Sequence, residues 1–173
     1  MKHILVIDDE HVIREVLYEV LSAENYEVAV CENGAEALSM LKEYEYDLVL
    51  CDIRLPDIDG LDLLNQIHKL HPNILFIMMT AYGTVESAVE AMKKGAQEYI
   101  TKPFHYDDVK IKIKRLFQFQ EMSSEKELLQ REVEDKYSLA DMIGKSTAMQ
   151  NIFQMIRKVA TVDSSVLITG ESG

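Results

Sequence analysis

The chain has 173 residues, 47% of them hydrophobic and 8% aromatic, which suits a globular core and allows one sizeable domain with appendages, or one domain and part of another. No apolar run approaches the roughly 18 residues of a membrane span, and the first residues lack the layout of a signal peptide, so we expect a cytoplasmic protein without a membrane partner. A net charge of −12 argues against nucleic-acid binding by these residues alone, because a phosphate backbone would be repelled.

Short apolar runs alternate with segments of helical periodicity through the first 119 residues. The runs are apolar throughout rather than at alternate positions, which indicates strands buried on both faces, as in a parallel sheet covered by helices. We predict strands at residues 4–7, 28–31, 48–51, 74–79 and 99–100. Asn33-Gly34 and Asp59-Gly60 mark turns before predicted helices at 35–42 and 61–70, and Thr84 is the predicted cap of a helix that reaches Met92. The fold class is therefore α/β.

Residues 120–140 are predicted to form a helical linker. Ser124 and Glu127 form a capping-box pattern that would start a new helix, so a continuous and a broken linker helix both remain open. A 3-4 spacing of apolar residues favours a dimer seam, although Lys126 occupies one of its positions. The seam residues are Phe119, Met122, Leu129 and Val133.

Polar residues follow four of the predicted strands. Asp8 and Asp9 follow the first strand, Asp52 the third, Thr80 the fourth and Lys102 the fifth. Ligands of a doubly wound sheet bind beyond the carboxyl ends of its strands, so we expect these side chains to share one site.

Three carboxylates in one site would repel each other unless a hard divalent cation such as Mg²⁺ were shared among them. The metal would neutralise an incoming phosphoryl group and let a carboxylate attack phosphorus. Taken singly, Asp9 could instead cap a helix and Asp52 could lie in a loop. Two alternatives for this site are a flavodoxin-like FMN site and an aspartyl phosphatase. Asp8-Asp9-Glu10 would repel the FMN phosphate, and the phosphatase pattern separates its two aspartates by one residue.

Four segments resemble the landmarks of the response-regulator receiver family: Ile7-Asp8-Asp9-Glu10, Leu50-Cys51-Asp52-Ile53-Arg54-Leu55-Pro56, Thr80-Ala81 and Thr101-Lys102-Pro103-Phe104. The resemblance assigns residues 1–119 to a receiver domain. It implies a flavodoxin-like, CheY-like sheet of five parallel strands in the order 2-1-3-4-5, with helices on both faces and a C-terminal helical linker.

The resemblance also implies the chemistry of the site. Asp52 would be the phosphoacceptor in a Mg²⁺-dependent phosphorylation and dephosphorylation that the domain catalyses itself, and Mn²⁺ is an alternative ion. Asp9 would bind the metal directly, Asp8 through water, and Asp52 and the backbone carbonyl of Arg54 would complete the site. Lys102 would pair with the phosphoryl oxygens.

A switch is implied as well. Thr80 would hydrogen-bond the new phosphoryl group, and Tyr99 would rotate between exposed and buried positions in response. Pro103 is expected to follow a cis peptide bond, as in the family.

Residues 141–173 resemble the start of the AAA+ ATPase domain of sigma-54-dependent, NtrC-type transcription activators. A second amphipathic segment at 141–160 precedes a predicted strand at 166–168 and an incomplete phosphate-binding loop, whose residues would be Gly170, Glu171, Ser172 and Gly173. We therefore expect no ATP hydrolysis by these residues; ATP, DNA and sigma-54 RNA polymerase would be contacted by domains beyond them.

The expected function is that of a two-component response regulator. A sensor histidine kinase would phosphorylate Asp52, and the change would alter a homodimer that controls the downstream ATPase and transcription. Whether phosphorylation relieves inhibition or activates directly is left open. The alternative is a constitutive dimerisation module with an unused acidic site.

Overall fold

The computed structural model describes residues 1–81, 83–136, 146–160, 165 and 167. The chain divides into two compact units, Met1–Gln120 and Glu121–Gly173. The candidate site lies in the first unit. The predicted domain boundaries at 119/120 and 140/141 stay predictions.

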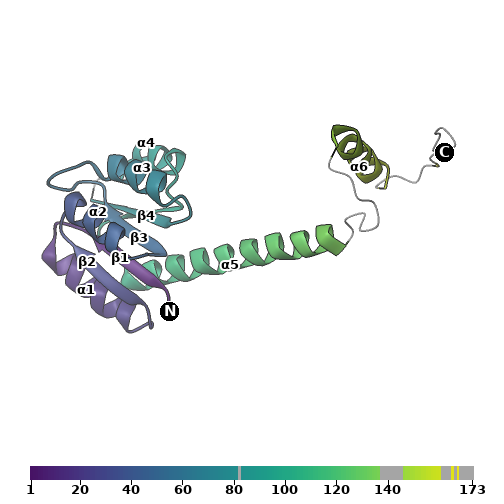
Figure 1. Ribbon diagram of the computed structural model, residues 1–173. Helices are drawn as coiled ribbons and strands as arrows, with labels where there is room; N and C mark the ends of the chain where they lie inside the picture. The colour runs from purple at the N-terminus through teal and green to yellow at the C-terminus, as the bar shows by residue number, and fades with distance from the viewer. Residues whose placement is uncertain (82, 137–145, 161–164, 166, 168–173) are drawn as a thin grey trace. The chain divides into compact units, whose positions relative to one another are not determined.

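The first unit is built on a parallel sheet of five strands in the order β2-β1-β3-β4-β5 (Figure 1). The predicted fold class and strand order are confirmed. The strands are β1 (His3–Ile7), β2 (Glu27–Cys31), β3 (Leu48–Asp52), β4 (Leu75–Thr80) and β5 (Glu98–Thr101).

Alternate strand residues serve different cores. On one face, Val49, Cys51 and their neighbours pack against α2 (Gly34–Glu43), α3 (Gly60–Leu70) and α4 (Val85–Lys93). On the other face, Leu48, Leu50 and their neighbours pack against α1 (His11–Ser22) and the first turns of α5 (Tyr106–Lys136). The sheet is thus covered on both faces, which is why its strands are apolar throughout.

The predicted turns at Asn33-Gly34 and Asp59-Gly60 lie where α2 and α3 begin, one residue earlier than predicted, and the predicted cap Thr84 is confirmed. The Asn33 side chain accepts from the Glu36 N–H, and Asp59 accepts from the Leu61 N–H. Thr84 forms a reciprocal capping box with Ser87. Each side chain satisfies a backbone donor that a helix start leaves unpaired.

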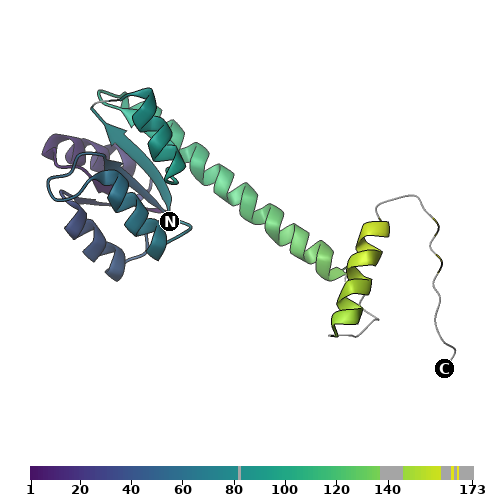
Figure 2. The ribbon, with the colours of Figure 1, turned by 90° about the horizontal axis from the view of Figure 1, so that it is seen from above.

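Helix α5 runs without interruption from Tyr106 to Lys136 (Figure 2). The capping-box pattern at Ser124 starts no new helix, so the linker is continuous to Lys136. Phe119 and Met122, two residues of the predicted seam, are exposed. The side chains of Leu129 and Val133 lie outside the described residues, and the seam stays a prediction.

In the second unit, α6 (Thr147–Val159) falls within the predicted segment 141–160 and begins at Ser146, whose hydroxyl accepts from the Met149 N–H. Residues 166 and 168–173 lie outside the described part of the chain, as do the predicted strand and phosphate-binding loop that depend on them. In the part of the chain that the structure describes, no helix is long and apolar enough to cross a membrane.

Candidate functional site

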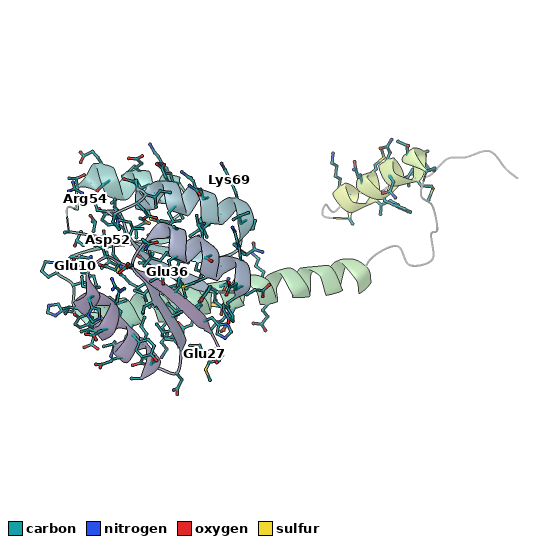
Figure 3. The ribbon with its side chains drawn as sticks, turned by 60° about the vertical axis from the view of Figure 1, so that its left-hand side comes forward. Glu10, Glu27, Glu36, Asp52, Arg54 and Lys69 are labelled. Carbon is teal, nitrogen blue, oxygen red and sulfur yellow. The ribbon has the colours of Figure 1, made fainter. Side chains whose placement is uncertain are left out.

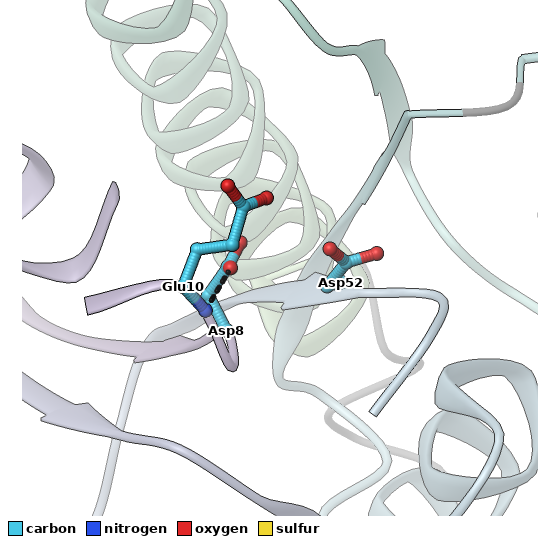
Figure 4. Close-up of side chains that lie close together, drawn as sticks. All are labelled: Asp8, Glu10 and Asp52. Carbon is cyan, nitrogen blue, oxygen red and sulfur yellow. Dashed lines mark hydrogen bonds between the residues drawn. The ribbon is translucent and has the colours of Figure 1, made fainter. Parts of the chain in front are cut away.

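Three carboxylates converge at the carboxyl edge of the sheet (Figure 4). Asp8 follows β1 and is fully buried, Asp52 ends β3 and is 6% exposed, and Glu10 lies at the exposed start of α1. One oxygen from each side chain lies within 4.8 Å of the others. The Glu10 N–H donates to Asp8 Oδ1 at 3.0 Å and fixes the turn between β1 and α1.

Lys102 brings an ammonium group to this cluster from the end of β5. Its Nζ lies 2.5 Å from Asp52 Oδ2, 2.7 Å from Asp8 Oδ2 and 3.1 Å from Glu10 Oε1. Burial alone would lower the pKa of Lys102, but the neighbouring carboxylates of Asp52 and Asp8 raise it above the usual range. Lys102 therefore carries its charge at neutral pH. The peptide bond between Lys102 and Pro103 is cis, as expected.

The ammonium group of Lys102 does not balance the charge and hydrogen-bonding capacity of the three carboxylates, as the contacts of Asp8 show. Asp8 Oδ2 is buried and accepts no hydrogen bond from the part of the chain that the structure describes, although it forms an ion pair with Lys102. Burial raises the pKa of Asp8, while Lys102 acts in the opposite direction. The three carboxylates exceed the charge of Lys102 by two units. A divalent cation with a preference for oxygen ligands, such as Mg²⁺, fits this donor set.

Glu10 was not predicted to belong to the site, and Asp9 was. The side chain of Asp9 is exposed and is not in the group of carboxylates that converge. Figure 3 shows Glu10 close to Asp52, at the carboxyl edge of the sheet. The signal for Glu10 was present, since it is the third acid in a row after a buried strand. The role of Asp9 as a direct ligand stays a prediction.

Arg14 is a second residue that the sequence reasoning missed. Its Nη1 donates to the backbone carbonyl groups of Asp8 at 2.6 Å and Asp9 at 2.9 Å. Its side chain is 12% exposed, and Nη2 lies 3.8 Å from Glu32. Arg14 thus stabilises the acidic turn through its backbone carbonyl groups, a contact that the sequence alone does not indicate.

The loop after β3 is fastened at both ends. The Arg54 N–H donates to Asp52 Oδ1 at 3.1 Å, which fixes the orientation of that carboxylate. The predicted role of the Arg54 carbonyl as a metal ligand stays a prediction. At the far end, the Gly60 N–H donates to the Ile53 carbonyl at 2.7 Å. A Cβ at Gly60 would lie 2.2 Å from the Asp52 carbonyl oxygen, so this contact requires glycine.

The middle of the same loop is attached to α2. Asp57 accepts from the N–H groups of Gly34 at 2.9 Å and Ala35 at 2.8 Å. Slight burial would raise the pKa of Asp57, but these bonds from backbone N–H groups lower it below its usual value. Asp57 therefore anchors the loop in its ionised form.

Thr80 and Tyr99 lie on adjacent strands at the same edge. Thr80 is 2% exposed and pairs with Thr101 in the register of β4 and β5. Tyr99 is half-buried, and its hydroxyl lies 2.8 Å from Ser87 Oγ. The sheet thus gathers Asp8, Asp52, Thr80 and Lys102 at one edge, as expected, while the roles of these residues and of Tyr99 stay predictions.

Comparisons with known proteins show the family to which this chain is similar. The model of the family described as the response regulator receiver domain matches residues 4–114. Transcriptional regulatory protein ZraR of Klebsiella oxytoca is 37% identical over 170 residues, which cover 98% of this chain. They cover 37% of ZraR, so the chain spans little more than a third of this relative.

Two solved structures are similar to the first unit. Response regulator protein TrrA from Thermotoga maritima, solved in complex with Mg²⁺-BeF, is 43% identical, with a TM-score of 0.61 and coverage of 67% of this chain and 99% of TrrA. The beryllofluoride-activated NtrC4 receiver domain dimer is 35% identical, with a TM-score of 0.66 and coverage of 68% and 98%.

Proposed function

This chain belongs to the response regulator receiver domain family, and from this premise we propose that it accepts a phosphoryl group on Asp52 from a sensor histidine kinase. Receiver domains are phosphorylated by histidine kinases and promote their own phosphorylation and dephosphorylation. The observation that carries the proposal is the setting of Asp52. Its carboxylate is buried, oriented by the Arg54 N–H and paired with Lys102 at 2.5 Å.

The transfer forms one bond and breaks one. A carboxylate oxygen of Asp52 attacks phosphorus, and the phosphorus–nitrogen bond of the donor phosphohistidine breaks, leaving an imidazole that takes up a proton. Lys102 then has a new partner, because the phosphoryl oxygens carry more charge than the carboxylate they modify. The ammonium already lies among the acids, so little rearrangement is needed.

Mg²⁺ is the proposed cofactor, with Mn²⁺ as an alternative. When bound, the ion neutralises the phosphoryl oxygens during transfer. Asp8, Glu10 and Asp52 supply the converging oxygens that would hold it. Asp9 and the Arg54 carbonyl are further candidate ligands from the sequence. Arg14 supports the turn that presents the acids.

The downstream part of the proposal concerns a longer protein. The similarity to ZraR, a transcriptional regulatory protein, supports a role in transcription, and the sequence of residues 141–173 favours the sigma-54 type. We propose that phosphorylation changes a homodimer through α5, as the dimeric state of the NtrC4 receiver suggests. Contacts with ATP, DNA and RNA polymerase would belong to further domains. The proposed compartment is the cytoplasm, where a kinase draws its phosphate from ATP.

Phosphorylation can be tested with a small phosphodonor. Acetyl phosphate and Mg²⁺ should add one phosphate to the wild-type chain, detected by intact mass spectrometry at neutral pH. Asp52→Asn should gain none, and the matched control Asp62→Asn, an exposed acid in the first turn of α3, should behave like the wild type. Equal labelling of Asp52→Asn would refute the proposal and favour a module with an unused acidic site.

The dimer is tested separately by sedimentation equilibrium. Beryllofluoride with Mg²⁺ mimics the phosphoryl group and should shift the association of the chain. An unchanged monomer with and without the mimic would remove the proposed role of α5.

A further inference from the structure

The side chain of Ser87 on α4 is hydrogen-bonded to Tyr99 on β5, the residue whose switch role is predicted. Ser87, in the first turn of α4, has its Oγ 2.8 Å from the phenolic oxygen of Tyr99 on β5. The same Oγ takes part in the capping box of α4. It lies 2.9 Å from the Thr84 carbonyl oxygen and 3.1 Å from the Thr84 nitrogen.

The hydrogens of this cluster can be assigned by counting. A serine hydroxyl has one hydrogen to donate and two lone pairs that accept. The Ser87 hydrogen goes to the Thr84 carbonyl, which can only accept, and one lone pair takes the Thr84 N–H. The second lone pair is left for Tyr99, whose oxygen at 2.8 Å is closer than Thr84 Oγ1 at 3.3 Å. Tyr99 is therefore the donor to Ser87.

The segment that leads into α4 lies close to the same strand. A Cβ at Gly83 would be 2.2 Å from Thr101 Cγ2 and 3.7 Å from a ring carbon of Tyr99. Thr80, which pairs with Thr101, precedes the cap residue Thr84 by four positions. Three residues therefore separate Thr80 from the cap of the helix start that holds the Tyr99 hydroxyl.

We propose that Ser87 is a latch: a positioning residue whose bond with Tyr99 holds the ring and the start of α4 in the arrangement of the unphosphorylated protein. The latch rests on the proposed phosphorylation of Asp52 and on the switch that the family resemblance implies, in which Tyr99 changes position when Asp52 is phosphorylated. In this proposal, the change of position of the Tyr99 ring carries its hydroxyl away from Ser87, so the bond breaks. A bond made only in the resting state opposes activation, and its loss shifts the population toward the active state.

The test uses beryllofluoride with Mg²⁺ as the probe, and its apparent affinity is measured by fluorine NMR titration. Ser87→Ala and Tyr99→Phe each remove one partner of the bond. Each should tighten the apparent affinity by about three- to tenfold, as expected for one hydrogen bond of ordinary net strength. The double variant should match the single variants, because all three lack the same bond. Tyr99→Phe leaves the cap of α4 intact and separates the latch from helix stability.

Thr84→Ala is the matched control, since it weakens the cap but keeps both partners of the latch. It should lower the protection of α4 amides from hydrogen exchange without tightening binding. The latch is refuted if the two single effects add in the double variant, if neither variant binds more tightly, or if Thr84→Ala tightens binding as Ser87→Ala does. Asp52→Asn distinguishes failure of the proposed phosphorylation from failure of the latch alone. If this variant binds beryllofluoride as the wild type does, both the proposed function and the latch are refuted.

Discussion

The anchoring of the loop by Asp57 leads to a prediction with a defined pH dependence. Replacing Asp57 with asparagine removes the charge and leaves one acceptor oxygen where two now accept from Gly34 and Ala35. Hydrogen bonds to charged groups contribute about 1.5–3 kcal/mol each when shielded. Asp57 is exposed, so solvent screens these bonds, and we expect a loss of about 1–2 kcal/mol in the free energy of unfolding.

The pH dependence follows from the lowered pKa of Asp57 in the folded chain. An acid whose folded pKa lies below its unfolded value, about 3.9 for aspartate, stabilises the fold fully above that unfolded value. The contribution is lost as the pH falls through the folded pKa. The stability gap between the wild type and Asp57→Asn should therefore be constant from neutral pH to about pH 5 and should close at more acidic pH.

Urea denaturation followed by far-ultraviolet circular dichroism measures this gap, because the chain has no tryptophan for fluorescence. The measurements are made with a chelator so that metal binding does not contribute. Asp108→Asn is the matched control, since Asp108 is an exposed acid in the first turn of α5, and its effect should stay within about 0.5 kcal/mol. A gap that persists undiminished at about pH 3, or no gap at neutral pH, would refute the reasoning.

Three further predictions concern the site. Gly60→Ala places a Cβ 2.2 Å from the Asp52 carbonyl oxygen and 2.9 Å from Ile53 Cα, so we expect a loss of about 2–3 kcal/mol on urea denaturation; a variant as stable as the wild type would contradict the contact. Lys102→Met leaves the buried carboxylates of Asp8 and Asp52 without their ammonium, and we expect the free energy of unfolding in chelator to fall by about 3 kcal/mol. Saturating Mg²⁺ should restore part of this loss, and equal stability with and without Mg²⁺ would count against a metal at this cluster. Mg²⁺ at about a hundred times its dissociation constant should stabilise the wild type by about 2.7 kcal/mol, measured as a rise in Tm, and less in Asp52→Asn.

The sheet and the helix starts were predictable because their signals are local. Apolar runs mark strands buried on both faces, and Asn33, Asp59 and Thr84 mark helix starts through hydrogen bonds to residues two or three positions away. The strand ends were less accurate, because each predicted strand differs from the observed one by one residue at one end or at both. Glu98 and Thr101 belong to the ladder although they are polar, because backbone pairing and not side-chain polarity defines a strand.

The membership of the acidic cluster was only partly predictable. Asp8, Asp52 and Lys102 could be placed at one edge because parallel strands end together. The choice between Asp9 and Glu10 depends on the turn between β1 and α1, which directs one side chain outward and the other toward Lys102. Neighbouring residues in a turn point in different directions, and sequence order does not record which one faces the site.

Individual side-chain contacts between distant loops and helices could not be predicted. Asp57 reaches α2 across 22 and 23 positions, and Ser87 reaches Tyr99 across 12. Each partner looks like an ordinary polar surface residue in the sequence. Such contacts depend on how closely two helices or loops approach, which is decided by packing of the cores beneath them.

The pairing of Lys102 with residues far ahead of it in the chain also governs when the protein can receive a signal. Lys102 is separated from Asp52 by 50 positions and from Glu10 by 92. During synthesis, the acids leave the ribosome long before the ammonium that joins them, and β5 must dock before the pocket exists. If Asp52 is the phosphoryl acceptor proposed above, a half-folded chain would lack the assembled pocket, and a kinase would phosphorylate only molecules in which β5 has joined the sheet.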